Sequence, residues 1–312
     1  MRVRSWLTGA AALVVLGAAA FWALTAPATF TALRGRGDAP RAGAPDLDNG
    51  RTLFNAGGCS SCHARPGQDD RTLLGGGLEL KSPFGSFYPP NISPDPTDGI
   101  GGWTVAQFIR AMREGVSPDG RHYYPAFPYT TYQRLTAADL GDLFAYIRTL
   151  PATPGQVRAH DLAFPFTVRR GLGLWKLAFL DGKPLAPDAA HDAEWNRGRY
   201  LVEAAGHCAE CHSPRNLAGA VDASRRYAGG PNPEGRGTVP NITPDESGIG
   251  SWSRDDIVEL LKTGFTPEFD SVGGSMAAVV RNTAQLSDGD REAMAAYLKS
   301  LKPLPSAAPK AN

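Results

Sequence analysis

The chain has 312 residues, enough for one large domain or for two domains of ordinary size. Hydrophobic residues make up 42% of it and charged residues 20%, which predicts a packed globular core. The 32 basic and 31 acidic side chains give a net charge of +1, so the chain lacks the basic footprint of a nucleic-acid-binding protein. A mean hydropathy of −0.26 excludes a membrane protein with many spans.

The N-terminal sequence is typical of an export signal or a membrane anchor. Arg2 and Arg4 precede an apolar run from Trp6 to Leu24 that contains no charged residue. Such a run fits a long signal peptide or a single membrane span. The Ala-Pro-Ala sequence at 26–28 resembles a cleavage site except for its central proline, and the run is longer than a usual signal core. We favour an uncleaved anchor over residues 1–30, with a cleaved signal as the alternative.

All four cysteines lie in two C-x-x-C-H motifs, CSSCH with Cys59, Cys62 and His63, and CAECH with Cys208, Cys211 and His212. This motif is the attachment signal of a c-type haem, whose iron is ligated by the histidine. Zinc would need further cysteines or paired histidines nearby, and a redox pair would need a β-α-β setting; the sequence shows neither. The sequence therefore predicts two covalently attached haems, and bacteria attach such haems outside the cytoplasm.

The chain contains two copies of one sequence unit, and equivalent positions are 149 residues apart. Cys59 and Cys208 are separated by this distance, and so are Trp103 and Trp252, which end the similar blocks PNISPDPTDGIGGW and PNITPDESGIGSW. A repeated order of motifs at one offset predicts two domains of the same fold. The predicted boundaries are 45–150 for the first domain, 151–189 for a linker and 190–305 for the second domain.

Hydrophobic periodicity and capping residues predict an all-α fold for both domains. The expected helices cover 50–56, begin at 104 and begin at 136 in the first copy, and cover 198–205, begin at 253 and begin at 287 in the second. The linker contains the apolar run FPFTVRRGLGLWKLAFL at 164–180. Two interpretations stay open: the run packs across both domains, or it is a docking surface for a partner or the membrane.

The sixth iron ligand distinguishes the two copies. Met276, in the loop GGSMAAV, lies 64 residues after His212 and is the predicted axial ligand of the second haem. The matching position after His63 is Phe127, which cannot ligate iron. The first haem then has an open site, a water ligand or a nearby side chain, for which the candidates are His122, Tyr124 and Met112. Core packing is the expected role of Met112 and Met294, which lie on apolar helix stripes.

Supporting interactions are also predicted for the ligating histidines. The second ring nitrogen of such a histidine usually donates to a backbone carbonyl, which is expected near Pro66 and Pro214, just past each motif. His160, His191 and His207 match no ligand pattern. His207 directly precedes Cys208 and is expected at the surface beside the haem edge.

These motifs, together with REGVSPDGRHYYPAFPY and the linker run, resemble the cytochrome c subunits of membrane-bound alcohol, gluconate and related dehydrogenases. The resemblance covers about residues 45–305 and implies two tandem cytochrome c-like domains. Members of that family commonly carry three haems, so this chain resembles a shorter diheme relative. The family often has YPAMPY, with its methionine as axial ligand, where this chain has Phe127 in YPAFPY.

The resemblance implies electron transfer on the periplasmic side of the bacterial inner membrane. A dehydrogenase subunit would oxidise a small alcohol, aldehyde or sugar acid, and the cytochrome would pass electrons to a quinone, an oxidase or a soluble cytochrome. The chain has no dinucleotide- or flavin-binding fingerprint and is not expected to be an enzyme by itself. The alternative is a diheme enzyme with an open first haem, either peroxidase-like or thiosulfate-oxidising.

Overall fold

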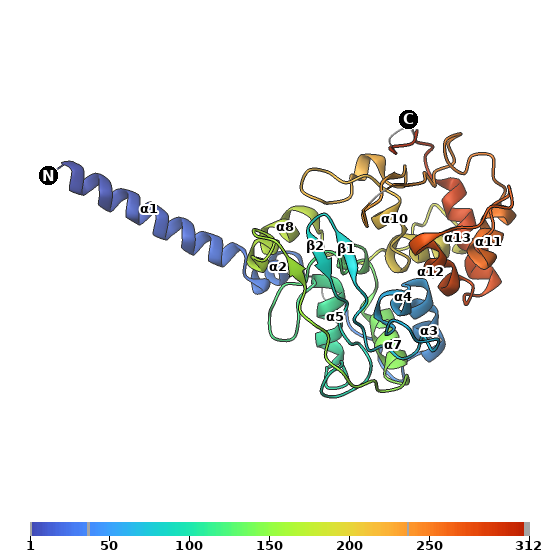
Figure 1. Ribbon diagram of the computed structural model, residues 1–312, viewed down its shortest axis with the longest axis horizontal. Coiled ribbons are helices and arrows are strands. Elements are labelled where there is room, and N and C mark those ends of the chain that lie inside the picture. The colour runs from blue at the N-terminus through green and yellow to red at the C-terminus, as the bar shows by residue number, and fades with distance from the viewer. Residues whose placement is uncertain (1, 36–37, 236, 309–312) are drawn as a thin grey trace.

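The computed structural model describes residues 2–35, 38–235 and 237–308. Helix α1 (Arg2–Leu24) extends away from the body, and α2 (Pro27–Arg34) lies at its base (Figure 1). In the described residues no single helix is long and apolar enough to cross a membrane, whereas Gly9–Leu24 and α2 meet that test together with a bend of 61°. The expected single-helix anchor is therefore not confirmed.

The first copy of the repeat folds as a group of helices around the first C-x-x-C-H motif. Its helices are α3 (Leu47–Ala56), α4 (Cys59–His63), α5 (Val105–Glu114), α6 (Tyr129–Tyr132) and α7 (Ala137–Ile147). Thr104 and Gln107 form a capping box that starts α5. Helix α3 crosses α7 at Gly50, where a Cβ atom would collide with the carbonyl oxygen of Asp142.

The second copy repeats this arrangement. Its helical segments are α9 (Ala193–Tyr200), the π-helical turn η2 (Leu201–Ala205), α10 (Cys208–Cys211), the 3-10 turn η3 (Ala223–Arg225), α11 (Arg254–Thr263), α12 (Gly274–Thr283) and α13 (Asp288–Ser300). Ser253 and Asp256 form the capping box of α11. Helix α9 crosses α13 at Gly198, where a Cβ atom would collide with the carbonyl oxygen of Ala293. The prediction of a mostly helical chain is confirmed.

Short β-ladders in the loops were not expected from the sequence. The strands are β1 (Leu80–Ser82), β2 (Gly85–Phe87) and β3 (Asp161–Leu162) in one antiparallel sheet, and β4 (Gly230–Pro231) and β5 (Thr238–Val239) in another. Each has two or three residues, which is too short to produce an alternating sequence pattern. The strictly all-α prediction is wrong in this detail.

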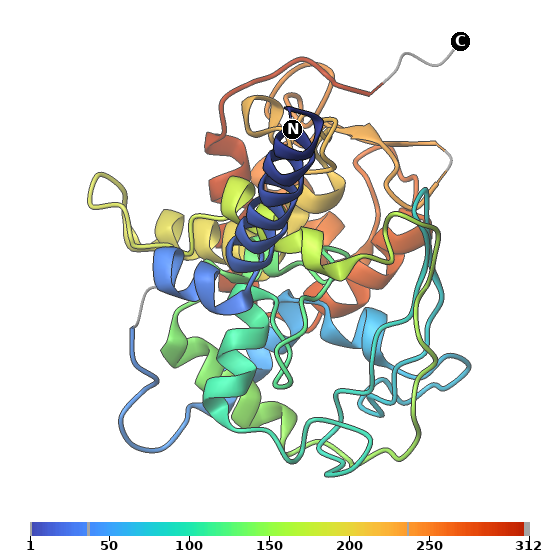
Figure 2. The same ribbon diagram turned by 90° about the vertical axis from the view of Figure 1, so that its left-hand side faces the viewer.

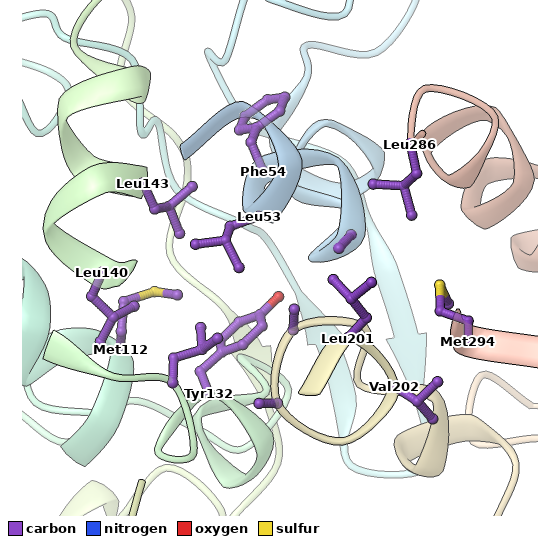
Figure 3. Close-up of a cluster of buried hydrophobic side chains, with 14 of the residues drawn as sticks. Leu53, Phe54, Met112, Tyr132, Leu140, Leu143, Leu201, Val202, Leu286 and Met294 are labelled. Carbon is purple, nitrogen blue, oxygen red and sulfur yellow. The ribbon is translucent and has the colours of Figure 1, made fainter. Parts of the chain in front are cut away.

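One buried core extends across both copies. Figure 3 shows Leu53, Leu140 and Leu143 on one side and Leu201, Val202 and Met294 on the other, with Tyr132 between the two groups. Met112 lies beside Leu140, and both Met112 and Met294 are buried, which confirms their packing role.

The linker forms the 3-10 turn η1 (Arg169–Gly171) and helix α8 (Leu172–Phe179). Trp175 Nε1 donates to the carbonyl of Ala218 in the second domain at 2.9 Å. Lys176 Nζ donates to the carbonyls of Glu114 and Gly115 in the first domain, each at 2.6 Å. The linker therefore packs against both domains, as one of its two interpretations expected.

Candidate haem sites

Each C-x-x-C-H motif forms a short helix with its two thiols one turn apart. Cys59 and Cys62 lie on α4, Cys208 and Cys211 lie on α10, and all four are half-buried and free of disulfides. Burial raises the pKa of the first cysteine in each motif to about 12 and of the second to about 11. The four side chains are therefore thiols at neutral pH, the form from which thioether bonds to haem are made.

The histidine of each motif is oriented by one hydrogen bond. His63 Nδ1 and the carbonyl of Pro90 are 2.8 Å apart, and so are His212 Nδ1 and the carbonyl of Pro240. Burial lowers the pKa of both rings, so each is neutral with Nδ1–H as the donor. Among the described residues only Nδ1 of each ring has a hydrogen-bond partner. Two thiols and a neutral imidazole with Nε2 available fit a c-type haem.

The prediction that the acceptor carbonyls lie near Pro66 and Pro214 is wrong. The chain turns away after each motif and returns some 27 residues later with the PNI block, whose first residue supplies the carbonyl. Gly76 N–H donates to the carbonyl of His63 at 2.7 Å, and Gly229 N–H donates to that of His212 at 2.9 Å. Both glycines have a positive φ, of 69° and 75°, and a Cβ atom there would press on the PNI backbone.

An asparagine holds each PNI block in place. Asn91 Nδ2 donates to the carbonyl of Thr153 at 2.6 Å, and Asn241 Nδ2 donates to that of Leu304 at 2.7 Å. Both acceptors lie just after the last helix of their domain. The repeated Pro-Asn pair in the sequence therefore marks the segment whose carbonyl orients each histidine. The C-x-x-C-H motif alone does not predict this segment.

Phe127 and Met276 occupy equivalent places in the two domains. The loop before each is closed by the same antiparallel bridge, Val116 with His122 and Phe265 with Ser271. Beyond this bridge the backbones differ. Met276 lies in the first turn of α12, so it precedes the last helix as expected, but the expectation that it lies in a loop is wrong. In the first domain Pro125 and Pro128 interrupt the helix, and α6 begins only at Tyr129.

His122 is engaged on both ring nitrogens and is not a free ligand. Nε2 donates to the carbonyl of Thr25 at 2.9 Å, and Nδ1 accepts from Lys176 Nζ at 3.0 Å. The residue is 3% exposed, and burial together with the Lys176 charge lowers its pKa to about 4. It is neither the sixth ligand nor an exposed loop histidine, because the end of α1 covers it.

The other candidate ligands of the first haem are also engaged elsewhere. Tyr124 donates its hydroxyl to the carbonyl of Phe166 at 2.7 Å, and Met112 is part of the core. The ring of Phe127 packs against Tyr123 and Tyr132, with centroids 5.7 and 5.8 Å apart. An aromatic cluster therefore occupies the region that contains the methionine in the second domain.

Reciprocal contacts join the two domains at their attachment helices. Glu210 on α10 accepts hydrogen bonds from the hydroxyls of Thr130 and Thr131 on α6, at 2.5 and 3.1 Å. Asn282 on α12 donates to Ser61 Oγ on α4 at 2.7 Å. The two helices that carry the haem-attachment cysteines therefore each contact the opposite domain: α10 contacts α6, and α4 contacts α12.

His207 belongs to this interface and not to the surface, where it was expected. Its Nε2 lies 3.2 Å from the carbonyl of Gly57, which also accepts from the Tyr132 hydroxyl at 3.0 Å, and the two rings are 5.9 Å apart. His207 has φ of 41°, in the left-handed region where the first domain has Gly58 with φ of 58°. The strained backbone brings an imidazole across the domain boundary.

Two further histidines have structural roles, in keeping with the prediction that they match no ligand pattern. His160 Nδ1 accepts from the backbone N–H of Tyr88 at 3.1 Å. His191 stacks on Trp195 with ring centroids 3.7 Å apart.

The cytochrome c family model matches residues 47–151 and 195–302, and the chain belongs to this family. Both matched regions contain one C-x-x-C-H motif and its PNI block. The chain is a diheme electron-transfer protein with two covalently bound c-type haems.

The sequence relatives agree with the expected resemblance. The chain is 51% identical over 306 residues to a "Diheme cytochrome c-type" of Cereibacter sphaeroides, covering 95% of this chain and 97% of the relative. It is 42% identical over 260 residues to the fructose dehydrogenase cytochrome subunit of Gluconobacter japonicus, covering 82% of this chain and 53% of the relative. It is 36% identical over 264 residues to the gluconate 2-dehydrogenase cytochrome c subunit of Pantoea cypripedii, covering 82% and 59%. The chain spans little more than half of the last two.

Proposed function

We propose that the chain transfers electrons from a periplasmic dehydrogenase subunit to a quinone, an oxidase or a soluble cytochrome of the respiratory chain. The observation that carries this proposal is the reciprocal interface, in which Glu210 on α10 and Ser61 on α4 contact the opposite domain. Because both attachment helices lie at the domain interface, the two redox centres are kept close, as serial electron transfer requires. The names of the cytochrome subunits related to this chain support a dehydrogenase as the electron donor.

The residue roles follow from the geometry of the two sites. The proposed attachment residues are Cys59 and Cys62 for the first haem and Cys208 and Cys211 for the second. His63 and His212 would bind the two irons through Nε2, and Met276 would provide the sixth ligand of the second. When bound, the haems supply reversible one-electron chemistry. The protein holds their histidines, excludes water and sets their spacing.

We further propose that α1 is retained as a membrane anchor, because its end is built into the folded body. Thr25 is fully buried, its carbonyl accepts from His122, and its hydroxyl accepts from Arg170 Nε at 3.0 Å. Arg170 Nη2 also donates to the carbonyl of Trp22 at 2.6 Å. Cleavage after residue 28 would remove these acceptors and uncover the buried His122, so the folded body is complete only with the end of α1 in place.

The proposed location is the periplasmic face of the bacterial inner membrane. Arg2 and Arg4 at the start of α1 favour a cytoplasmic N-terminus by the positive-inside rule. The haem domains would then lie on the opposite side, where haem attachment takes place.

Membranes from cells with and without the chain test the electron-transfer proposal. Small alcohols, aldehydes and sugar acids are added, and haem reduction and oxygen uptake are followed. We expect at least one substrate class to reduce both haems, and its oxidation by oxygen to stop without the chain. A variant with Cys208→Ser and Cys211→Ser, which keeps the first site, should lose oxygen uptake as well. Substrate oxidation that is unchanged in the absence of the chain would contradict the proposal.

A second candidate function is catalysis at the first haem, which Phe127 at the position of Met276 favours. Purified chain would then reduce peroxide to water at the expense of a reduced electron donor, or would oxidise thiosulfate and pass the electrons to an oxidised one-electron acceptor. Sustained turnover of either compound would replace the electron-transfer proposal with this one.

A further inference from the structure

Four exposed apolar side chains lie on the part of the linker whose residues Arg170 and Gly173 contact the base of α1. They are Phe164, Phe166, Val168 and Leu174, which are 81%, 43%, 49% and 41% exposed, and we call them the apolar collar. Helix α8 lies next to the base of α1 in both views of the molecule (Figures 1 and 2). The approach is close, since a Cβ atom on Gly173 would lie 2.6 Å from the α-carbon of Thr25.

The length of α1 indicates where a bilayer would end. Trp6 and Trp22 are 80% and 65% exposed near the two ends of this helix. Their 16-residue separation is about 24 Å at 1.5 Å per residue, which is shorter than a hydrocarbon core of about 30 Å, and a bilayer accommodates such a mismatch by local thinning. Tryptophan favours the two membrane–water interfaces. Trp22 therefore marks the level of the lipid headgroups on the side of the folded body.

The η1 turn of the linker lies at that same level. The guanidinium of Arg170 stacks over the Trp22 ring, 3.9 Å from its centroid. Arg170 is in η1, directly between Val168 and Leu174 of the apolar collar, and Arg169 is its neighbour. Aromatic and aliphatic side chains next to arginines are the composition that binds an interface of anionic lipids.

We propose that the apolar collar inserts into the periplasmic leaflet of an anionic phospholipid bilayer, as a second membrane contact beside α1. This inference rests on the proposed anchoring by α1. A single helix lets the attached body swivel and tilt, whereas a helix and an inserted collar hold it in one orientation. The haem domains would then face a membrane-bound electron acceptor at a constant height and angle.

Thiol labelling of the full-length holoprotein in nanodiscs tests the collar. The discs contain phosphatidylcholine and phosphatidylglycerol and no other protein, so only lipid can cover the collar. Phe164→Cys introduces one reactive thiol, because the four native cysteines are bonded to haem. Phe269→Cys is the matched control, since Phe269 is 89% exposed on a loop of the second domain. The rate of reaction with a membrane-impermeant maleimide is divided by that of the same variant after denaturation.

We expect the thiol at 164 to react several-fold more slowly than the thiol at 269. Equal normalised rates in chains that have entered the discs would overturn the collar contact and leave the anchor proposal intact. A chain that stays outside the discs would overturn the anchor, and the collar inference with it. Tryptic digestion patterns of both variants, matched to those of the unmodified chain, confirm that neither substitution unfolds the linker.

Discussion

The two haem domains agree on the side of the histidine and differ on the opposite side. His63 and His212 each lie 2.8 Å from a proline carbonyl, and each has a glycine of positive φ donating to its own carbonyl. The distal segments share a bridge and then diverge, with Phe127 in one and Met276 in the other. The repeat therefore keeps the haem-attachment residues in both domains, while the residue at the position proposed for the sixth ligand differs.

This difference has a backbone cause as well as a side-chain cause. Gly274 permits a helix to start two residues before Met276, whereas Pro125 and Pro128 hold the first domain in a turn. The two irons are expected to differ in potential, since a methionine ligand raises the potential of a histidine-ligated haem. An unequal pair gives electrons a preferred direction through the chain.

The largest expected effect is that of Met276→Ala. Losing the thioether should abolish the near-infrared band that marks sulfur ligation of ferric haem and lower the potential of the second haem. Near-infrared absorption and a redox titration measure the two effects. Met294→Leu is the control, because Met294 is a buried core residue and should leave the band in place. A band that survives Met276→Ala would show that another group ligates the second iron.

Phe127→Met tests the same difference in the first domain, by adding the methionine that the second domain has. The new thioether lies at the place equivalent to Met276, so the near-infrared band should approach twice its intensity and the lower potential should rise. Phe127→Leu, which changes size without adding a ligand, should alter neither. If Phe127→Met leaves the spectrum unchanged, the turn between Pro125 and Pro128 holds position 127 away from the iron.

The smallest expected effect concerns the interface residue His207. In His207→Gly the lost hydrogen bond to Gly57 costs about 1 kcal/mol, and relief of the left-handed backbone returns a similar amount. Denaturation should therefore show a net change below about 1 kcal/mol. The corresponding substitution in the first domain, Gly58→Ala, adds backbone strain and only an ordinary van der Waals contact with Ser61 Oγ at 3.7 Å, and should cost about 1–2 kcal/mol. Equal losses in both variants would contradict this account of the strained histidine.

Local sequence signals predicted the helices well, because their causes lie within a few residues. The capping boxes at Thr104 and Ser253 start the expected helices, as their hydrogen bonds reach only three positions ahead. The two haem-attachment motifs are also predictable from the sequence, because the spacing of their cysteines and histidine lies within five residues. The helical start at Gly274 was missed, since glycine carries no helix signal.

The supports of the site depend on contacts between distant segments, which spacing does not encode. The carbonyls of Pro90 and Pro240 reach their histidines only after the chain has looped away and returned. His122 is buried because α1 ends over it, 97 residues earlier in the chain. His207 crosses to the other domain, so its role required the arrangement of both copies.

The most direct test of two unequal haems is carbon monoxide binding to the reduced full-length protein. Carbon monoxide binds ferrous iron that lacks a strong sixth ligand, and its stoichiometry is measured by optical titration. The structure predicts rapid binding at one haem in each chain, the one held by His63, since His122, Tyr124 and Met112 are engaged elsewhere. Binding at neither haem, or equally at both, would contradict the central claim that the two sites differ in their sixth ligand.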